Sequence, residues 1–216
     1  ALWRSLGLSI DWTQTYHTIG EHPQRVAQKA FLRNLARGEA YQKDAPGLWD
    51  VTFQTAVAQA ELESREYPGF YHKVAFRFED GTPIYIETTR PELLAACGAL
   101  IAHPDDERYK PYFGQYVYSP LFKVKVPILA HPAAEMDKGA CIAMCCTFGD
   151  VTDVEWWRDL NLPLRSIIQR NGRIVMDTPD WIEDEEGKRV FQETAGKTTL
   201  SARKIIVDAL RESGDL

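Results

Sequence analysis

The chain lacks long apolar runs, a cysteine framework and a basic excess. No apolar stretch approaches the roughly 18 residues that a membrane-spanning helix needs, so we expect no membrane partner. The chain has 4 cysteines among 216 residues and no C-x-x-C pair, which argues against a disulfide scaffold. Reduced thiols are then expected, together with a cytoplasmic location.

The net charge of -6 gives no general support for nucleic-acid binding, because chains that bind nucleic acid alone usually carry a basic excess. A local basic face or another part of a larger protein would have to supply such binding. The sequence starts at Ala1 with neither a signal nor a transit peptide, and we expect an internal piece of a longer chain.

The templates for common catalytic folds are also missing. The sequence contains no G-x-G-x-x-G, G-x-x-x-x-G-K-[ST], G-x-S-x-G or H-E-x-x-H motif. Its 44% hydrophobic and 26% charged residues are ordinary for a globular protein.

Short strands are predicted in the middle of the chain, with helices at both ends and one between strands. This pattern favours a mainly β or α+β fold, a β-barrel with peripheral helices. Residues 183–195 are acidic and polar, with no predicted element. Predicted helices cover 21–38, 150–160 and 199–212, and predicted strands cover 70–78, 84–89, 99–103, 121–129, 140–147 and the hairpin arms 164–168 and 173–176 around Asn171-Gly172.

A threonine-rich motif, E-T-T-R-P-E, runs from Glu87 to Glu92 at the end of a predicted strand. The proline turns the chain out of the sheet, which places two hydroxyls and an arginine at a rim. Hydroxyls at a rim can orient a water or a sugar hydroxyl. A threonine-rich strand end with a surface arginine is the simpler alternative.

Two aspartates, Asp150 and Asp153, follow a predicted buried strand and open a predicted helix. Their i, i+3 spacing places both carboxylates on one side of the first turn. Such a pair can hold an ammonium group and bind a hydroxyl. The alternative is an N-cap followed by a first-turn acid.

Two groups of metal-ligating residue types occur, and for both we favour a structural interpretation. His103, Asp105 and Asp106 suit a capped turn better than a metal site. The second group, Cys141, Cys145 and Cys146 with His131, lies largely inside an apolar run and lacks the knuckle spacing of zinc sites, which favours buried thiols. We therefore expect neither a metal nor a cofactor.

In order, the motifs T-T-R-P-E, H-P-D-D-E-R-Y, P-L-F-x-x-x-V-P-I and T-F-G-D-x-x-D-V-x-W-W resemble the editing insertion of valyl-tRNA synthetases. The resemblance covers nearly the whole chain. It implies a catalytic-domain flank and linker at 1–55, an editing β-barrel at 56–182 and a return segment with a C-terminal helix at 183–216. The H-I-G-H and K-M-S-K-S signatures that handle ATP in this family are absent.

The resemblance implies hydrolysis of threonine esterified to tRNA(Val). The implied partners are the acceptor end of that tRNA and the rest of the synthetase chain. A second site is needed because an apolar pocket discriminates poorly against an isostere that adds a hydroxyl. A non-catalytic module that positions tRNA is the alternative, and a metalloprotein using the cysteines is a third reading.

The resemblance also implies a role for each residue that stands at a matching motif position. Asp153 would bind the substrate ammonium and Asp150 its hydroxyl. Water would attack the ester, with a ribose hydroxyl of the RNA orienting it and backbone N–H groups stabilising the oxyanion. The remaining carried-over positions are Thr88, Thr89 and Arg90 beside the terminal adenosine and ester, and Thr147 and Phe148 in the pocket wall.

Three positions depart from the family pattern. Met144 stands where many valyl enzymes have a lysine that helps bind the hydroxyl, so hydroxyl recognition must differ. Cys141 replaces a glycine, which either narrows the pocket or fills a backbone position that needs glycine. Leu93 stands where relatives often have threonine, and its larger side chain would shrink the pocket.

Overall fold

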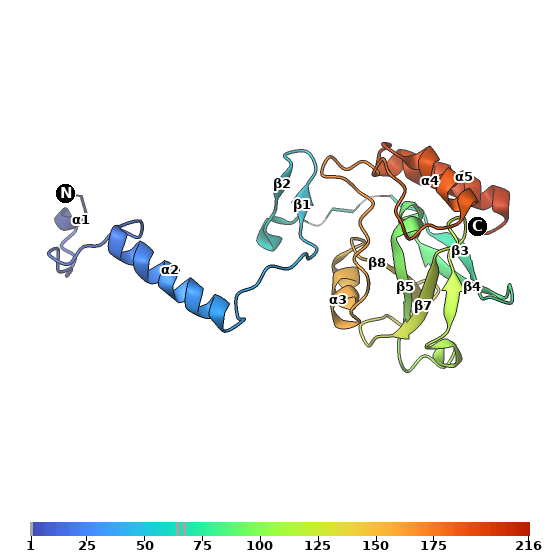
Figure 1. Ribbon diagram of the computed structural model, residues 1–216, viewed down its shortest axis with the longest axis horizontal. Helices are drawn as coiled ribbons and strands as arrows, with labels where there is room; N and C mark the ends of the chain where they lie inside the picture. The colour runs from blue at the N-terminus through green and yellow to red at the C-terminus, as the bar shows by residue number, and fades with distance from the viewer. Residues whose placement is uncertain (1, 64, 67) are drawn as a thin grey trace. The chain divides into compact units, whose positions relative to one another are not determined.

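A computed structural model describes residues 2–63, 65 and 66, and 68–216 (Figure 1). The chain forms two compact units, Ala1–Asp44 and Ala45–Leu216. The first unit contains α1 (Leu2–Ser5) and α2 (Glu21–Ala36). Helix α2 has no buried residue, and its apolar side chains at Val26, Phe31 and Leu35 are about half exposed.

A six-stranded mixed sheet dominates the second unit, in the order β4-β3-β6-β7-β5-β8. Strands β5 and β7 are parallel, and the other neighbours are antiparallel. Edge strands β4 and β8 approach each other, so the sheet is a nearly closed barrel, as predicted. The strands are β3 (His72–Arg77), β4 (Pro83–Thr88), β5 (Cys97–Ala102), β6 (Tyr116–Tyr118), β7 (Lys125–Ala130) and β8 (Ile142–Cys146), with a separate ribbon of β1 (Trp49–Asp50) and β2 (Thr55–Ala56).

Strand β5 is buried on both faces, which explains its uninterrupted apolar sequence. Leu100 and Ala102 point into the main core inside the barrel. Ala99 and Ile101 point the other way, into a smaller cluster that includes Trp156 of α3 (Val151–Asp159). Helix α3 is thereby packed on the outside of the sheet beside β8 (Figure 1).

Two C-terminal helices belong to the same core as the barrel. Helix α4 (Glu185–Thr194) buries Val190 and Phe191, and α5 (Thr199–Ser213) buries Ile206 and Leu210. Helix α5 also contacts η2 (Pro91–Ala96), the 3₁₀ helix that follows β4. The remaining short 3₁₀ turns are η1 (Gln59–Glu61) and η3 (Lys110–Tyr112).

Several sequence-based boundaries were wrong. The 121–129 strand begins only at Lys125, because Leu121 and Lys123 have φ of 60° and 53° in a tight turn. The arms 164–168 and 173–176 form single bridges, Ile168 to Ile174 and Arg173 to Thr198, and no strand. Helix α4 lies where no element was predicted. The division into 1–55, 56–182 and 183–216 stays a prediction.

No helix among the described residues is long and apolar enough to cross a bilayer.

Candidate functional site

A cavity of about 440 Å³ opens between the ends of β4 and β8 and the start of α3. Its volume is in the range of small-molecule sites. The predicted site residues that line it are Thr88, Thr89, Arg90, Leu93, Met144, Asp150 and Asp153. These positions come from two stretches that are remote in sequence, 88–93 and 144–153, and the curled sheet brings them together.

The Asp153 carboxylate is the most buried acid of the cavity wall, with 7% relative exposure. Its Oδ1 accepts the backbone N–H of Cys146 at 2.8 Å, and its Oδ2 accepts that of Asp150 at 2.9 Å. The Asp150 side chain in turn accepts the backbone N–H of Asp153 at 3.0 Å, which completes a capping box at the start of α3. The aspartate pair is therefore a helix cap and a cavity wall at once.

Burial, reinforced by the negative charge of Asp150, raises the pKa of Asp153 from 3.8 to about 7. The two backbone N–H bonds oppose this rise only in part. No lysine, arginine or histidine forms an ion pair with Asp153 in the described part of the chain. A bound cation would favour the charged carboxylate, so the site is suited to an ammonium group.

Arg90 is bonded to the protein on two sides. Its Nη1 donates to the carbonyl of Gly149 at 2.5 Å, and its Nε lies 3.4 Å from Oε1 of Glu92. Its backbone N–H donates to the Thr88 hydroxyl at 3.0 Å. The T-T-R motif thus binds the loop between β8 and α3.

Thr147 and Phe148 do not line this cavity. Thr147 is buried, and its hydroxyl donates to the carbonyl of Pro163 and accepts the N–H of Arg165, both at 3.1 Å. Phe148 faces a second, more apolar cavity of about 590 Å³, which Trp49 also lines. Thr147 and Phe148 are adjacent after β8 but point to different sides. Their position in the motif therefore did not predict which cavity each side chain faces.

Cys141 lines the cavity in a left-handed backbone conformation, with φ of 61°. This is a position where glycine is the least strained residue, as the sequence comparison with the family suggested. All four cysteines are free and buried. Burial raises the pKa of Cys146, which also lines the cavity, and keeps that thiol protonated.

The H-P-D-D-E-R-Y motif forms the predicted capped turn and supports the cavity wall. The buried Asp106 accepts two bonds from the Arg108 guanidinium, at 2.8 and 2.6 Å. Arg108 also donates to the carbonyl of Met136, and the Tyr109 hydroxyl donates to that of Ala140 at 2.5 Å. His103 accepts the backbone N–H of Asp105 and stays in the turn.

Sequence reasoning assigned no role to some residues of the cavity. Glu87, at the end of β4, lines it, and a Cβ added to Gly139 would lie 3.1 Å from the Glu87 carboxylate. Trp156 lines it from α3. The i, i+3, i+6 spacing of Asp150, Asp153 and Trp156 on one helix face was the available signal.

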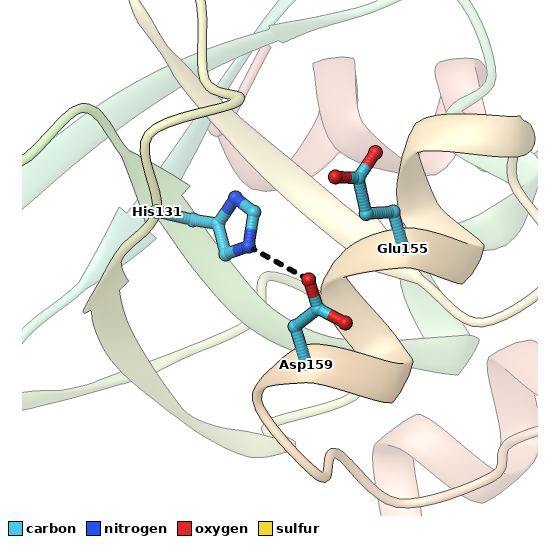
Figure 2. A group of neighbouring side chains, drawn as sticks. All are labelled: His131, Glu155 and Asp159. Atoms are coloured by element: carbon cyan, nitrogen blue, oxygen red, sulfur yellow. Dashed lines mark ion pairs between the residues drawn. The ribbon is translucent and has the colours of Figure 1, made fainter.

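In the described part of the chain, one group of potential metal ligands lies outside the cavity: His131 after β7, and Glu155 and Asp159 on α3 (Figure 2). His131 Nε2 faces Asp159 Oδ2 at 3.5 Å. Its Nδ1 accepts the backbone N–H of Ala133 at 3.1 Å, so the proton of the neutral ring belongs on Nε2. A histidine that binds metal through Nε2 normally donates from Nδ1, and this group does not fit that arrangement.

Comparisons with known proteins agree with the motif order. The family described as tRNA synthetases class I (I, L, M and V) matches residues 1–198. Valine--tRNA ligase of Bifidobacterium longum (strain DJO10A) is 91% identical over 216 residues, which are 100% of this chain and 24% of that protein. Valine--tRNA ligase of Cutibacterium acnes is 65% identical over 215 residues, which are 100% of this chain and 25% of that protein.

A solved ternary complex of Agrobacterium radiobacter K84 LeuRS, tRNA and LeuAMS covers 97% of this chain and 34% of its own, with 19% identity and a TM-score of 0.48. The chain spans 24% of the length of the first Bifidobacterium relative. Because the family match extends over 198 of the 216 residues, the chain belongs to the class I tRNA synthetases of the isoleucine, leucine, methionine and valine group.

Proposed function

We propose that the cavity hydrolyses the ester bond of mischarged threonyl-tRNA(Val) as the editing site of a valyl-tRNA synthetase. One observation carries the proposal: a buried carboxylate, Asp153, faces a cavity of about 440 Å³ without a cationic partner among the described residues. The α-ammonium of an aminoacyl ester is a cation of suitable size. Its binding would recover part of the free energy lost when the carboxylate is buried.

The reaction uses water as the nucleophile. No histidine among the described residues lines the cavity, and the Cys146 thiol stays protonated, so neither supplies a general base. In the proposed mechanism, Asp153 fixes the amine while a ribose hydroxyl of the RNA orients the water. Thr88 and Thr89 line the same cavity, where their hydroxyls can bind the terminal ribose or the ester.

The rest of the synthetase supplies what this chain lacks. The chain covers 24% of the Bifidobacterium relative, and its own net charge is -6, so most contacts with tRNA(Val) would come from other parts of the protein. The exposed apolar side chains of α2 would pack against those parts. As for other cytosolic translation enzymes, we propose a cytoplasmic location.

Deacylation of threonyl-tRNA(Val) by the full synthetase tests the proposal. Asp153→Ala should abolish hydrolysis. It also leaves two backbone N–H groups without their acceptor, so Asp153→Asn, which keeps one acceptor oxygen without the charge, is needed as a second variant. Glu155→Gln, an exposed position on the same helix, is the matched control and should keep full activity.

Loss of hydrolysis in both Asp153 variants, with circular dichroism unchanged in Asp153→Asn, supports the role. Hydrolysis retained in Asp153→Asn excludes ammonium binding by a charged Asp153. A wild-type protein that binds tRNA but never deacylates it would favour the tRNA-positioning alternative.

A further inference from the structure

The Glu92 side chain has no exposed surface and joins the cavity to the C-terminal helix. Arg203 of α5 donates to both of its oxygens, Nε to Oε2 at 2.8 Å and Nη2 to Oε1 at 2.7 Å. The same Oε1 lies 3.4 Å from Nε of Arg90. Two arginines that are remote in sequence thus share one buried carboxylate.

The contacts continue from Arg90 to the cavity loop. Arg90 donates to the carbonyl of Gly149, and Gly149 packs directly against the carboxylate of Asp153. The N–H groups of Cys146 and Asp150, on either side of this contact, hold the two oxygens of Asp153. The loop backbone therefore determines where the Asp153 carboxylate lies.

We infer that Arg203 and Glu92 are positioning residues for the proposed hydrolysis, acting through Arg90 on the loop that holds Asp153. The inference rests on the proposed function. A bidentate arginine–carboxylate pair fixes both direction and distance, which a lone ammonium cannot do. The positive charges of Arg203 and Arg90 do not oppose each other, because Glu92 lies between them and pairs with both.

The pair further changes the role expected for Arg90. Its guanidinium bonds a backbone carbonyl and a buried carboxylate, and its side chain is only 36% exposed. Arg90 therefore stabilises the loop, in addition to lying where the resemblance implies the terminal adenosine and ester. Removing Arg203 leaves Glu92 with Arg90 alone, which should draw Arg90 away from Gly149.

Kinetics of threonyl-tRNA(Val) deacylation by the full synthetase test the inference. Arg203→Gln should lower kcat about tenfold or more, with KM nearly unchanged, because a small displacement of Asp153 misaligns the substrate whose amine it fixes. Arg203→Lys should keep more of the kcat than Arg203→Gln, since lysine keeps the positive charge but cannot form the bidentate pair with Glu92. Combining Arg203→Gln with Glu92→Gln should cost no more than the larger single effect.

Two controls separate positioning from general loss of structure. Ile206→Val removes one methyl from the buried face of the same helix and should leave kcat unchanged. The pH profile of kcat/KM should move to higher pH in Arg203→Gln, because the N–H bonds that hold down the pKa of Asp153 weaken. Loss of folding stability alone would not shift that profile.

Failure of the inference and failure of the proposed function are distinguishable. If the wild-type protein does not deacylate, the proposed function fails, and the positioning role fails with it. If the wild-type protein is active and Arg203→Gln keeps its kcat and pH profile, only the positioning role is overturned. An equal loss in Ile206→Val would also overturn it.

Discussion

Gly149 lies so close to Asp153 that a Cβ on residue 149 would be 2.0 Å from Oδ2 of that aspartate. We predict that Gly149→Ala displaces the carboxylate, breaks the capping box of α3 and lowers the free energy of unfolding by roughly 2 kcal/mol. Threonyl-tRNA deacylation should fall sharply. Urea denaturation and the deacylation rate measure the two effects.

Gly98→Ala is the matched control for this substitution. A Cβ on Gly98 in β5 would have its nearest neighbour at 3.8 Å, which is ordinary van der Waals contact. It should therefore keep both stability and activity. Equal effects of the two substitutions would show that contact with Asp153 is not the cause.

The raised pKa of Asp153 predicts that stability falls with increasing pH. Its pKa is 3.8 in the unfolded chain and about 7 in the folded chain, so the folded state binds the proton more tightly. The stabilisation is complete below pH 3.8 and is lost as the pH rises to about 7. The shift corresponds to at most about 4 kcal/mol, because water in the cavity screens part of it.

Chemical denaturation at several pH values between 4 and 8, compared with Asp153→Asn, measures this loss. In Asp153→Asn, the free energy of unfolding should lack the part of its pH dependence that Asp153 contributes. In the active protein, kcat/KM should rise up to about pH 7 as Asp153 ionises, and fall above about pH 8 as the substrate amine loses its proton. A profile that is flat between pH 5 and 8 would contradict the role.

The group of His131, Glu155 and Asp159 is predicted to bind no divalent cation tightly. Since Nδ1 of His131 accepts the N–H of Ala133, coordination through Nε2 would require this hydrogen bond to break. Excess Zn²⁺ should leave the unfolding midpoint of the wild-type protein unchanged. A saturable rise in the midpoint that is absent in His131→Asn would refute the tautomer argument.

Local sequence patterns were sufficient for the strand end at Thr88 and the helix start at Asp150 and Asp153. In both places, the residues that form the element also form the site. The pair of Glu92 and Arg203 could not be predicted in this way, because its members are 111 residues apart and neither has a distinctive neighbourhood. Only the packing of α5 on η2 brings them together.

Other errors have equally local causes. Helix α4 was missed because Val190 and Phe191 are nearly its only large apolar residues, and its other residues are mainly charged or polar. Thr147 and Phe148 were placed in the pocket wall by their position beside Asp150. At the end of β8, however, side chains alternate in direction, so being adjacent in sequence does not place residues on the same surface.

The last prediction concerns Cys141, because its backbone conformation favours the glycine that the family resemblance implies at this position. The left-handed φ of 61° costs a residue with a side chain about 1–2 kcal/mol, which Cys141→Gly would recover. Lost burial of the thiol and greater freedom of the unfolded chain offset most of this gain. The net change in unfolding free energy should therefore stay within about 1 kcal/mol.

The matched control is Cys145→Gly, at a buried cysteine in the same strand region without a positive φ. There glycine relieves no strain, loosens strand β8 and leaves a cavity beside Trp156, so stability should fall by about 2–3 kcal/mol. Cys141→Gly should also widen the cavity and keep deacylation. If thermal denaturation shows the same loss of stability for both variants, the left-handed backbone at Cys141 carries no strain. The presence of cysteine in place of glycine at this position then has its cause in the thiol itself.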